Sequence, residues 1–394
     1  MKKMKIMLLT HSFTPEISPP QRRWSIIVDE LGQLGHEITV VTPKSNRIAS
    51  NRQRRLLGHS YLKLQHYPSM RRSKTMLGKV LKHGIDAVLS VPAAFQGQKP
   101  DVIVATVPAI PTLIVGFAAS RLRRVPLVVD LRDAWPDLLS ESQVIKLRWV
   151  EPVISKFISF IVNRSDMLVT VTHGLALKMQ RNGMQNIATI PNGVETERAD
   201  LEVAQRESDG ELHILYLGNI GRSQGLETVI RAMEHVPGSV RLRIVGQGTE
   251  KAKLMSLAMD LGLNIDFKAP VYGQEVLDNY AWADTCVVSL RPDWPSFNHT
   301  VPSKLYELLY LNQHVTGLVK GEAAEIIRDS DAGVVIEQNV PALAAYINTV
   351  VASPEILQTN RRGTDWVMKH GSLRQAGREY AKLLVTVVDA HSKR

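Results

Sequence analysis

The feature that most constrains this fold is an alternation of short apolar runs with stretches of helical apolar periodicity. In the first half of the chain, runs of four or five apolar residues are separated by amphipathic stretches such as Trp24–Leu34 and Ile110–Leu122. Strand and helix in alternation indicate βαβ units and a parallel sheet covered on both faces. The predicted strands of this half are Ile6–Thr10, Ile38–Thr42, Val102–Thr106, Leu127–Asp130, Met167–Val171 and Ile187–Ile190.

The same alternation restarts after a polar, acidic stretch. Residues 195–211 show no apolar periodicity and are predicted to be a linker. With 394 residues, the chain is long enough for two domains of the α/β class, each doubly wound. Ligands of such sheets bind beyond the carboxyl ends of the strands. The predicted strands of the second half are Ile214–Leu217, Leu242–Val245, Ile265–Phe267, Thr285–Ser289, Val315–Gly317 and Val334–Ile336.

The net charge of +10 is unevenly distributed. Residues 1–195 hold 27 Lys and Arg against 13 Asp and Glu, and the excess is concentrated in the acid-free region 44–82. We interpret this region as an anionic-membrane surface, because Leu56, Leu57, Tyr61, Leu62 and Leu64 accompany the cations. A solvated basic loop is the alternative. Nucleic acid is not an expected partner, since no recognition motif or aromatic interleaving is present.

Two further features bear on the cellular context. The single cysteine, Cys286, excludes a disulfide framework and indicates a reducing, cytoplasmic location. The uncharged run Val102–Ser120 has the length of a membrane span, but Pro108 and Pro111 interrupt it. We therefore expect a strand, a turn and a helix there.

A glycine-rich turn follows the first strand of the second domain. The segment Gly218-Asn-Ile-Gly-Arg-Ser-Gln-Gly225 joins a buried strand to a helix that opens near Leu226. Glycines let the backbone approach a phosphate, and the helix N-terminus attracts negative charge. Arg222 can bridge two phosphate oxygens, so the segment predicts a phosphate site.

Weaker signals follow three other strands. Val245-Gly-Gln-Gly248 lacks the third glycine of a dinucleotide fingerprint, so an NAD site is rejected. In Val301-Pro-Ser-Lys-Leu-Tyr-Glu307 the helix N-terminus is a second anion site, Ser303 can cap it, and Glu307 can hold two ribose hydroxyls. A capped helix with a surface glutamate is the alternative.

Charged residues also end a strand of the first domain. In Val129-Asp-Leu-Arg-Asp-Ala-Trp-Pro136, Asp133 can take a proton or hold a hydroxyl; an Arg–Asp pair that ties a loop is the alternative. Asp329-Ser-Asp331 has the spacing of a metal-binding acid pair, and we interpret it as a helix-end turn.

Taken together, these segments resemble the family 4 glycosyltransferases of the GT-B fold, two Rossmann-like domains that face each other across a cleft. The nearest subgroup is the WbuB-like transferases of bacterial surface polysaccharides. The segments that carry the resemblance are Phe13–Glu16, Gly35–Pro43, Leu131–Pro136, Ile190–Val194, Gly218–Gly225 and Val301–Glu307.

The resemblance implies roles for both domains. Residues 1–194 would bind the acceptor, with helix 373–394 packing back on them, and residues 212–372 would bind a UDP-sugar. Arg132 and Asp133 would face the anomeric carbon, and Arg23 would contact the acceptor. Donor contacts would come from Gly218, Asn219, Gly221, Arg222, Gly246, Val271, Ser303, Lys304 and Glu307, with the base near Val271.

Such enzymes usually retain anomeric configuration without a metal ion, so no metal and no cofactor are expected. Cationic side chains and helix termini would stabilise the leaving diphosphate instead. The implied reaction moves a hexose or N-acetylhexosamine to a lipid-linked saccharide at the inner face of the cell membrane, where the protein would be peripheral.

Three positions depart from the family pattern. The glycine pair of the first loop is Ser18-Pro19, the phosphate lysine is Gln224, and the first glutamate of an E-x₇-E pair is His299. His299 can donate to a sugar hydroxyl or simply lie in a loop. Two other functions stay open: a UDP-N-acetylglucosamine 2-epimerase-like enzyme, which shares the architecture, and a non-catalytic sugar-nucleotide-binding protein.

Overall fold

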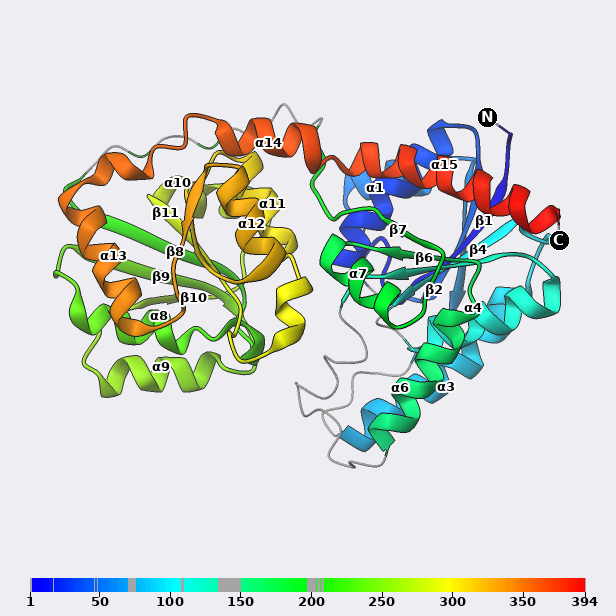
Figure 1. Cartoon of the computed structure of the whole chain (residues 1–394), viewed down its shortest axis with the longest axis horizontal. Helices are drawn as coiled ribbons and strands as arrows, with labels where there is room; N and C mark the ends of the chain where they lie inside the picture. The colour runs from blue at the N-terminus through cyan, green and yellow to red at the C-terminus, as the bar shows by residue number, and fades with distance from the viewer. Residues whose placement is uncertain are drawn as a thin grey trace. The chain divides into compact units, whose positions relative to one another are not determined.

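The computed structural model contains two compact units, each built on one parallel sheet (Figure 1). Unit 1 comprises Met1–Asn192 with Leu373–Arg394, and unit 2 comprises Gly193–Ser372. The predicted α/β class with two doubly wound sheets is confirmed. The structure describes residues 2–393 except 17, 46, 48, 70–75, 108–109, 134–149, 197–202, 204–205 and 207–208, so most of the predicted linker lies outside this description.

Unit 1 has the strand order β3-β2-β1-β4-β5-β6-β7, all parallel. Side chains of β1 alternate between two cores, with Ile6 and Leu8 in one and Met7 and Leu9 in the other. Both faces of the sheet are therefore buried under helices, which explains its continuous apolar strands. The strands are β1 Lys5–Leu9, β2 Glu37–Pro43, β3 Leu62–Tyr67, β4 Val102–Val107, β5 Leu127–Leu131, β6 Met167–Thr170 and β7 Ile187–Thr189. The helices are α1 Pro19–Gln33, α2 Asn51–Leu57, α3 Met76–Phe95, α4 Ile110–Arg123, α6 Val150–Asn163, α7 His173–Arg181 and α15 Leu373–Ser392.

The C-terminal helix α15 packs against α1, at the opposite end of the sequence (Figure 1). Glu30 accepts hydrogen bonds from Arg374 at 3.1 Å and Arg378 at 2.8 Å. A Cβ at Gly377 would lie 2.7 Å from the Cβ of Glu30, so only glycine permits this close approach. The first helix begins at Pro19, where Ser18 caps it by accepting from the Gln21 N–H.

Unit 2 repeats the topology with six parallel strands in the order β10-β9-β8-β11-β12-β13. Its core lies between the central strands and helices α8 and α13. The strands are β8 Leu212–Asn219, β9 Val240–Gln247, β10 Asp266–Lys268, β11 Thr285–Ser289, β12 Val315–Leu318 and β13 Gly333–Val335. The helices are α8 Glu227–Ala232, α9 Lys251–Asp260, α10 Gln274–Trp282, α11 Ser303–Tyr310, α12 Gly321–Asp329, α13 Val340–Ala352 and α14 Arg362–His370, with short 3₁₀ turns η1 Arg222–Gln224, η2 Met233–His235, η3 Pro295–His299 and η4 Pro354–Leu357.

The basic region 44–82 differs from its sequence interpretation. It contains an unpredicted edge strand, β3, and the apolar residues expected to face lipid pack on the core instead. Strand β3 pairs with β2 over six residues, which turns Leu62 and Tyr67 inward. The membrane interpretation was therefore wrong about Leu56, Leu57, Tyr61, Leu62 and Leu64. Among the side chains of this region whose exposure is described, the exposed cations are Lys44, Arg47, Arg54, Arg55 and Lys63, and residues 70–75 lie outside the description.

The uncharged run at 102–120 forms strand β4 and helix α4 in succession, as predicted. Among the described residues, no single helix is both long and apolar enough to cross a membrane. One pair, Val340–Ala352 with Pro354–His370, reaches that length and composition only jointly and across a 110° bend.

Candidate functional site

The strand order of unit 2 reverses direction between β8 and β11. Connections from β8 lead outward to β9 and β10, whereas those from β11 lead to β12 and β13 on the other side. Ligands of open α/β sheets bind beyond the carboxyl ends of the strands at such a switch point. The predicted phosphate loop follows β8, and the predicted ribose helix α11 follows β11. The fold therefore brings both predicted donor segments to the two sides of this switch point, where such sheets form their ligand crevice.

The loop after β8 is held by its own side chains. Oε1 of Gln224 accepts from the Gly221 N–H at 3.0 Å and from Nδ2 of Asn219 at 3.4 Å. The loop then closes through Gly225, whose φ of 59° lies in the left-handed region. Gln224, which stands where many relatives carry a lysine, thus accepts a hydrogen bond from a backbone N–H that a phosphate would otherwise use.

The strand on the other side of the switch point fixes the same loop. Oγ of Ser289 donates to the Gln224 carbonyl at 2.5 Å, and the Arg291 N–H donates to the Ser223 carbonyl at 2.9 Å. Sequence reasoning missed Ser289 and Arg291. Ser289 ends a fully buried strand, so a search for polar residues at strand ends would have found it.

Arg222 is the exposed cation of this loop. Nothing in the described part of unit 2 forms a hydrogen bond or ion pair with its guanidinium. Its charge also acts on the nearby Asp293. The pKa of the Asp293 carboxyl is lowered chiefly by its hydrogen bond from Arg291, and the charge of Arg222 lowers this pKa further. Arg222 is therefore available to an incoming anion, as predicted from its place between the glycines.

The glycines after β9 serve backbone packing. A Cβ at Gly246 would lie 1.9 Å from the Gly218 carbonyl oxygen, and one at Gly248 would lie 1.9 Å from that of Ile220. Gly246 also has a φ of 147°. These contacts explain the G-x-G sequence without a ligand, so the predicted donor role of Gly246 is indirect: it lets the loop after β8 lie against β9.

Helix α11 begins differently from its prediction. Its N-cap is Pro302, Ser303 is the first helical residue, and no side chain caps the helix. The predicted capping by Ser303 is therefore wrong, because a cap must precede the first helical residue. The N–H groups of Ser303 and Lys304 lie in the first turn, where they suit an anion.

Glu307 lies one turn inside α11. Its Oε1 accepts from the Tyr280 hydroxyl and from Nζ of Lys304, both at 3.1 Å. Its side chain is 16% exposed, so part of it is accessible to solvent. Tyr280, which sequence reasoning missed, fixes this carboxylate from α10. Such an oriented acceptor suits the vicinal hydroxyls of a ribose.

Two other predicted donor-side residues are His299 and Val271. His299 ends η3 and is half-buried, and Val271 lies in the loop after β10 beside Tyr272, which is 59% exposed.

In unit 1, Arg132 and Asp133 follow β5. Burial raises the pKa of the Asp133 carboxyl, although the Arg132 charge opposes the shift. Nε of Arg132 is buried, and within the described ranges it has no hydrogen-bond partner. Both side chains are intermediate in exposure, and a carboxyl with a raised pKa beside an arginine at a strand end is a candidate for a group that meets a reacting centre. Residues 134–136 lie outside the description.

Arg23 lies in the interior. Its side chain is 2% exposed; it donates to the carbonyls of Ile190 (2.8 Å) and Pro191, and it lies 4.0 Å from Asp130. Asp130 is fully buried and also accepts from Tyr380 of α15 and from Trp24 at 3.3 Å. These contacts favour a structural role for Arg23 over the predicted contact with an acceptor. The four side chains, which we name the Asp130 cluster, tie α1, β5 and α15 together.

One group of potential metal ligands lies at the amino end of β8. Ligand atoms of Asp209, Glu211 and His213 lie within 4.8 Å of one another. Arginines already pair with the carboxylates, however: Arg206 bonds Asp209, and Arg241 bonds both oxygens of Glu211. These ion pairs disfavour a dication here. The pair Asp329 and Asp331 is likewise no metal pair, because Asp331 bonds Arg362.

Comparison with known proteins identifies the family. A glycosyl transferase 4-like domain model matches residues 20–193, and a glycosyl transferases group 1 model matches residues 197–363. This chain is a family 4 glycosyltransferase. The enzyme is 24% identical to the putative colanic acid biosynthesis glycosyl transferase WcaI of Escherichia coli, over 89% of its own chain and 93% of the relative. It is also 24% identical to a GDP-mannose-dependent alpha-mannosyltransferase of Mycobacterium tuberculosis, over 87% and 91%.

Solved structures show the fold of the glycosyltransferase. HepE of Anabaena in complex with UDP-glucose matches with a TM-score of 0.68 at 15% identity, covering 97% of this chain and 100% of that one. Sucrose-phosphate synthase of Thermosynechococcus elongatus matches with a TM-score of 0.73 at 16% identity, covering 98% and 100%. The predicted GT-B architecture is confirmed, and the family membership excludes the epimerase-like and non-catalytic alternatives.

Proposed function

We propose that the enzyme transfers a hexose or N-acetylhexosamine from a UDP-sugar to a lipid-linked saccharide, with retention of configuration, during assembly of a bacterial surface polysaccharide. The observation that carries this proposal is the switch point of unit 2, where the Gly218–Gly225 loop and α11 lie on adjoining strand ends. The similarity to WcaI, a putative colanic acid biosynthesis glycosyl transferase, supports the class of product.

The donor diphosphate fits the exposed cation and the backbone donors at this crevice. Arg222 would hold it bidentately, and the N–H groups of Ser303 and Lys304 would add the field of a helix terminus. Glu307, fixed by Tyr280, would accept from both ribose hydroxyls. Removing a donor of this kind from a developing negative charge costs about 2.7–4 kcal/mol in the barrier.

The base is proposed to be uracil, held near Val271. HepE binds UDP-glucose with the same fold, which supports this choice. The mannosyltransferase relative, which depends on GDP-mannose, makes guanine the rival. A comparison of UDP- and GDP-sugars therefore belongs in the first experiment.

The chemical step is proposed to need no metal ion. The bond from the anomeric carbon to the diphosphate oxygen breaks while the acceptor oxygen attacks the same face. The departing phosphate takes the acceptor proton, and Arg222 and Lys304 compensate the charge that develops. Arg132 and Asp133 would orient the acceptor, Asp133 by holding a hydroxyl, and His299 would donate to the donor sugar.

A cytoplasmic enzyme on the inner face of the membrane is the proposed location. Exposed side chains of unit 1 support this proposal. Phe157 and Phe160 of α6 are each 45% exposed, and Val88 of α3 is 71% exposed; both helices pack on α4. Arg164 lies 4.5 Å from the Phe160 ring centroid. Aromatic and cationic groups together suit the interface of an anionic membrane.

A panel of nucleotide-sugars tests the proposal. The full-length enzyme would be incubated with UDP-glucose, UDP-N-acetylglucosamine, UDP-galactose and GDP-mannose, and mass spectrometry would follow slow hydrolysis and transfer to a polyprenyl diphosphate-linked sugar. We expect one UDP-sugar to be consumed and the product to keep the donor's anomeric configuration by NMR. Consumption of GDP-mannose alone would refute the base, and inversion would refute the retaining step.

Anionic vesicles test the location separately. We expect the enzyme to sediment with phosphatidylglycerol vesicles at low salt and less at high salt, and the double variant Phe157→Ser/Phe160→Ser to sediment less. Equal sedimentation with neutral phosphatidylcholine vesicles would contradict the proposed surface.

A further inference from the structure

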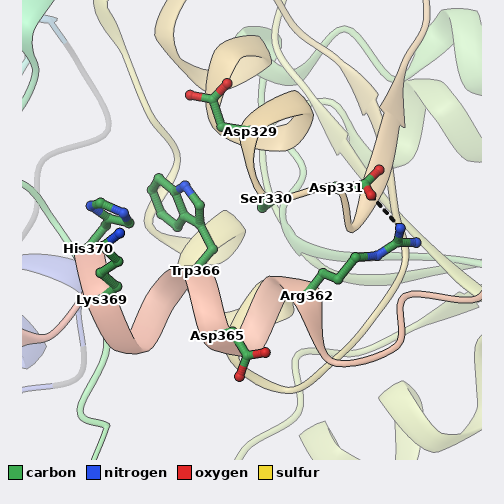
Figure 2. A pocket seen from close by; sticks show the side chains of 8 residues that line it. All are labelled: Asp329, Ser330, Asp331, Arg362, Asp365, Trp366, Lys369 and His370. Atoms are coloured by element: carbon green, nitrogen blue, oxygen red, sulfur yellow. Dashed lines mark hydrogen bonds and ion pairs between the residues drawn. The ribbon is translucent and has the colours of Figure 1, made fainter.

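A second concavity lies in unit 2, away from the donor crevice. It has a volume of about 690 Å³ and lies between the end of α12, the start of β13 and helix α14 (Figure 2). Because the strands are parallel, the start of β13 and the end of β8 lie at opposite ends of the strands. This pocket, which we name the α14 pocket, is therefore separate from the Gly218–Gly225 loop.

The wall of the α14 pocket is fixed by internal bonds. Arg362 donates to the carbonyls of Thr359 at 3.0 Å and Gln358 at 3.1 Å, and it pairs with Asp331. The buried Ser330 donates to the Ile327 carbonyl at 3.1 Å. The part of the wall formed by Arg362, Asp331 and Ser330 is thus pre-formed, and a ligand would not have to order these three groups.

One side of the pocket offers an aromatic surface. Trp366 is half-buried, and its ring centroid lies 5.0 Å from that of His370 with the planes 37° apart. Figure 2 shows both rings projecting from α14, with Asp329 across from them at the end of α12. The face of an indole carries negative charge density, which attracts the polarised C–H groups of a pyranose ring.

Polar groups of opposite sign surround this aromatic surface. Asp329 and Lys369 line the pocket, and both side chains are exposed. A carboxylate only accepts and an ammonium only donates, so together they match the mixed donor and acceptor character of sugar hydroxyls. Asp331 and Asp365 line the pocket as well, which disfavours a phosphate or another anion.

From this combination we infer that the α14 pocket binds a neutral saccharide of one or two pyranose rings, stacked on Trp366 and hydrogen-bonded by Asp329 and Lys369. The volume suits a ligand of this size, since small-molecule sites range from about 300 to 1,000 Å³. The inference does not depend on the identity of the donor.

Saturation-transfer NMR on the full-length protein tests the inference, with N,N′-diacetylchitobiose, lactose and maltose as probes. We expect at least one disaccharide to bind with millimolar affinity. Trp366→Ala should weaken binding at least tenfold, Trp366→Phe should retain most of it, and Asp329→Asn should weaken it about threefold or more. Met368→Ala is the matched control, because Met368 is 52% exposed on the same helix and does not line the pocket.

The donor site provides the second control. Arg222→Ala should leave disaccharide binding unchanged, so a failed donor site and a failed α14 pocket are distinguishable. The inference is overturned if no disaccharide binds, if Trp366→Ala and Asp329→Asn both bind like the Met368→Ala control, or if glucose 6-phosphate binds more tightly than the neutral sugars. Should Trp366→Ala fail to fold, Asp329→Asn against Met368→Ala decides.

Discussion

The two sheets of this enzyme share the order of six strands, to which unit 1 adds β7, yet the charged residues near their strand ends are used in different ways. In unit 1, Arg23 and Asp130 are buried and bonded to α15 and to backbone carbonyls. In unit 2, Arg222 is exposed on a loop fixed by neutral partners, Gln224 and Ser289. A charged residue at a strand end therefore identifies a ligand site only when its partners leave the charge accessible.

The Asp130 cluster gives the largest expected effect. Asp130→Ala would leave the Arg23 guanidinium buried without its carboxylate, and such losses cost about 3–5 kcal/mol. We expect urea denaturation of the full chain to show a drop of this size in the free energy of unfolding. The control is Glu227→Ala, which breaks an exposed pair with Arg231 and should cost less than about 1 kcal/mol. Equal losses would contradict the contrast between the two regions.

The backbone contact behind the donor loop comes next. Gly246→Ala would place a Cβ against the Gly218 carbonyl oxygen at a φ that side chains rarely adopt. We expect a loss of about 1–3 kcal/mol in unfolding free energy and weaker UDP binding by calorimetry. Gly262 also has a positive φ, but a Cβ there would meet no atom within 4 Å. Gly262→Ala should therefore leave UDP binding intact. If both variants bind UDP like wild type, the loop does not depend on this contact.

Gln224 tests how the loop accepts a phosphate. Gln224→Lys would release the Gly221 N–H and add a cation, so UDP should bind up to about tenfold more tightly. Calorimetry at two salt concentrations measures the effect, which should shrink at high salt. Weaker binding would show instead that the Gln224 amide is needed to hold the loop open.

Asp133 gives the smallest effect, and its sign follows from burial. Because its folded-state pKa is raised, the native state binds the proton more tightly than the unfolded state. The stabilisation it provides is fully present below the unfolded pKa and is lost as the pH rises through the folded pKa. Asp133→Asn should therefore be more stabilising relative to wild type at pH 8 than at pH 4, as measured by thermal unfolding. An effect that does not change with pH would contradict the raised pKa of this carboxyl.

The sequence predicted what depends on local pattern. Buried strands such as β4 and β8, and the glycine loop that follows β8, were found because apolar runs and glycines report local conformation directly. The edge strand β3 was missed because its alternation, Leu62 and Leu64 separated by Lys63, lies among many cations. The pairing of Asp130 with Tyr380 could not be predicted, since 250 residues separate them and only the packing of α15 on α1 brings them together.

Binding of UDP to the switch point of unit 2 is the most direct test of the account. Calorimetry would compare the wild type with Arg222→Ala and Glu307→Ala, and with Arg231→Ala as an exposed cation outside the crevice. We expect Arg222→Ala and Glu307→Ala each to weaken UDP binding by about tenfold or more, whereas Arg231→Ala should bind UDP like the wild type. Unchanged UDP affinity in both Arg222→Ala and Glu307→Ala would contradict the account.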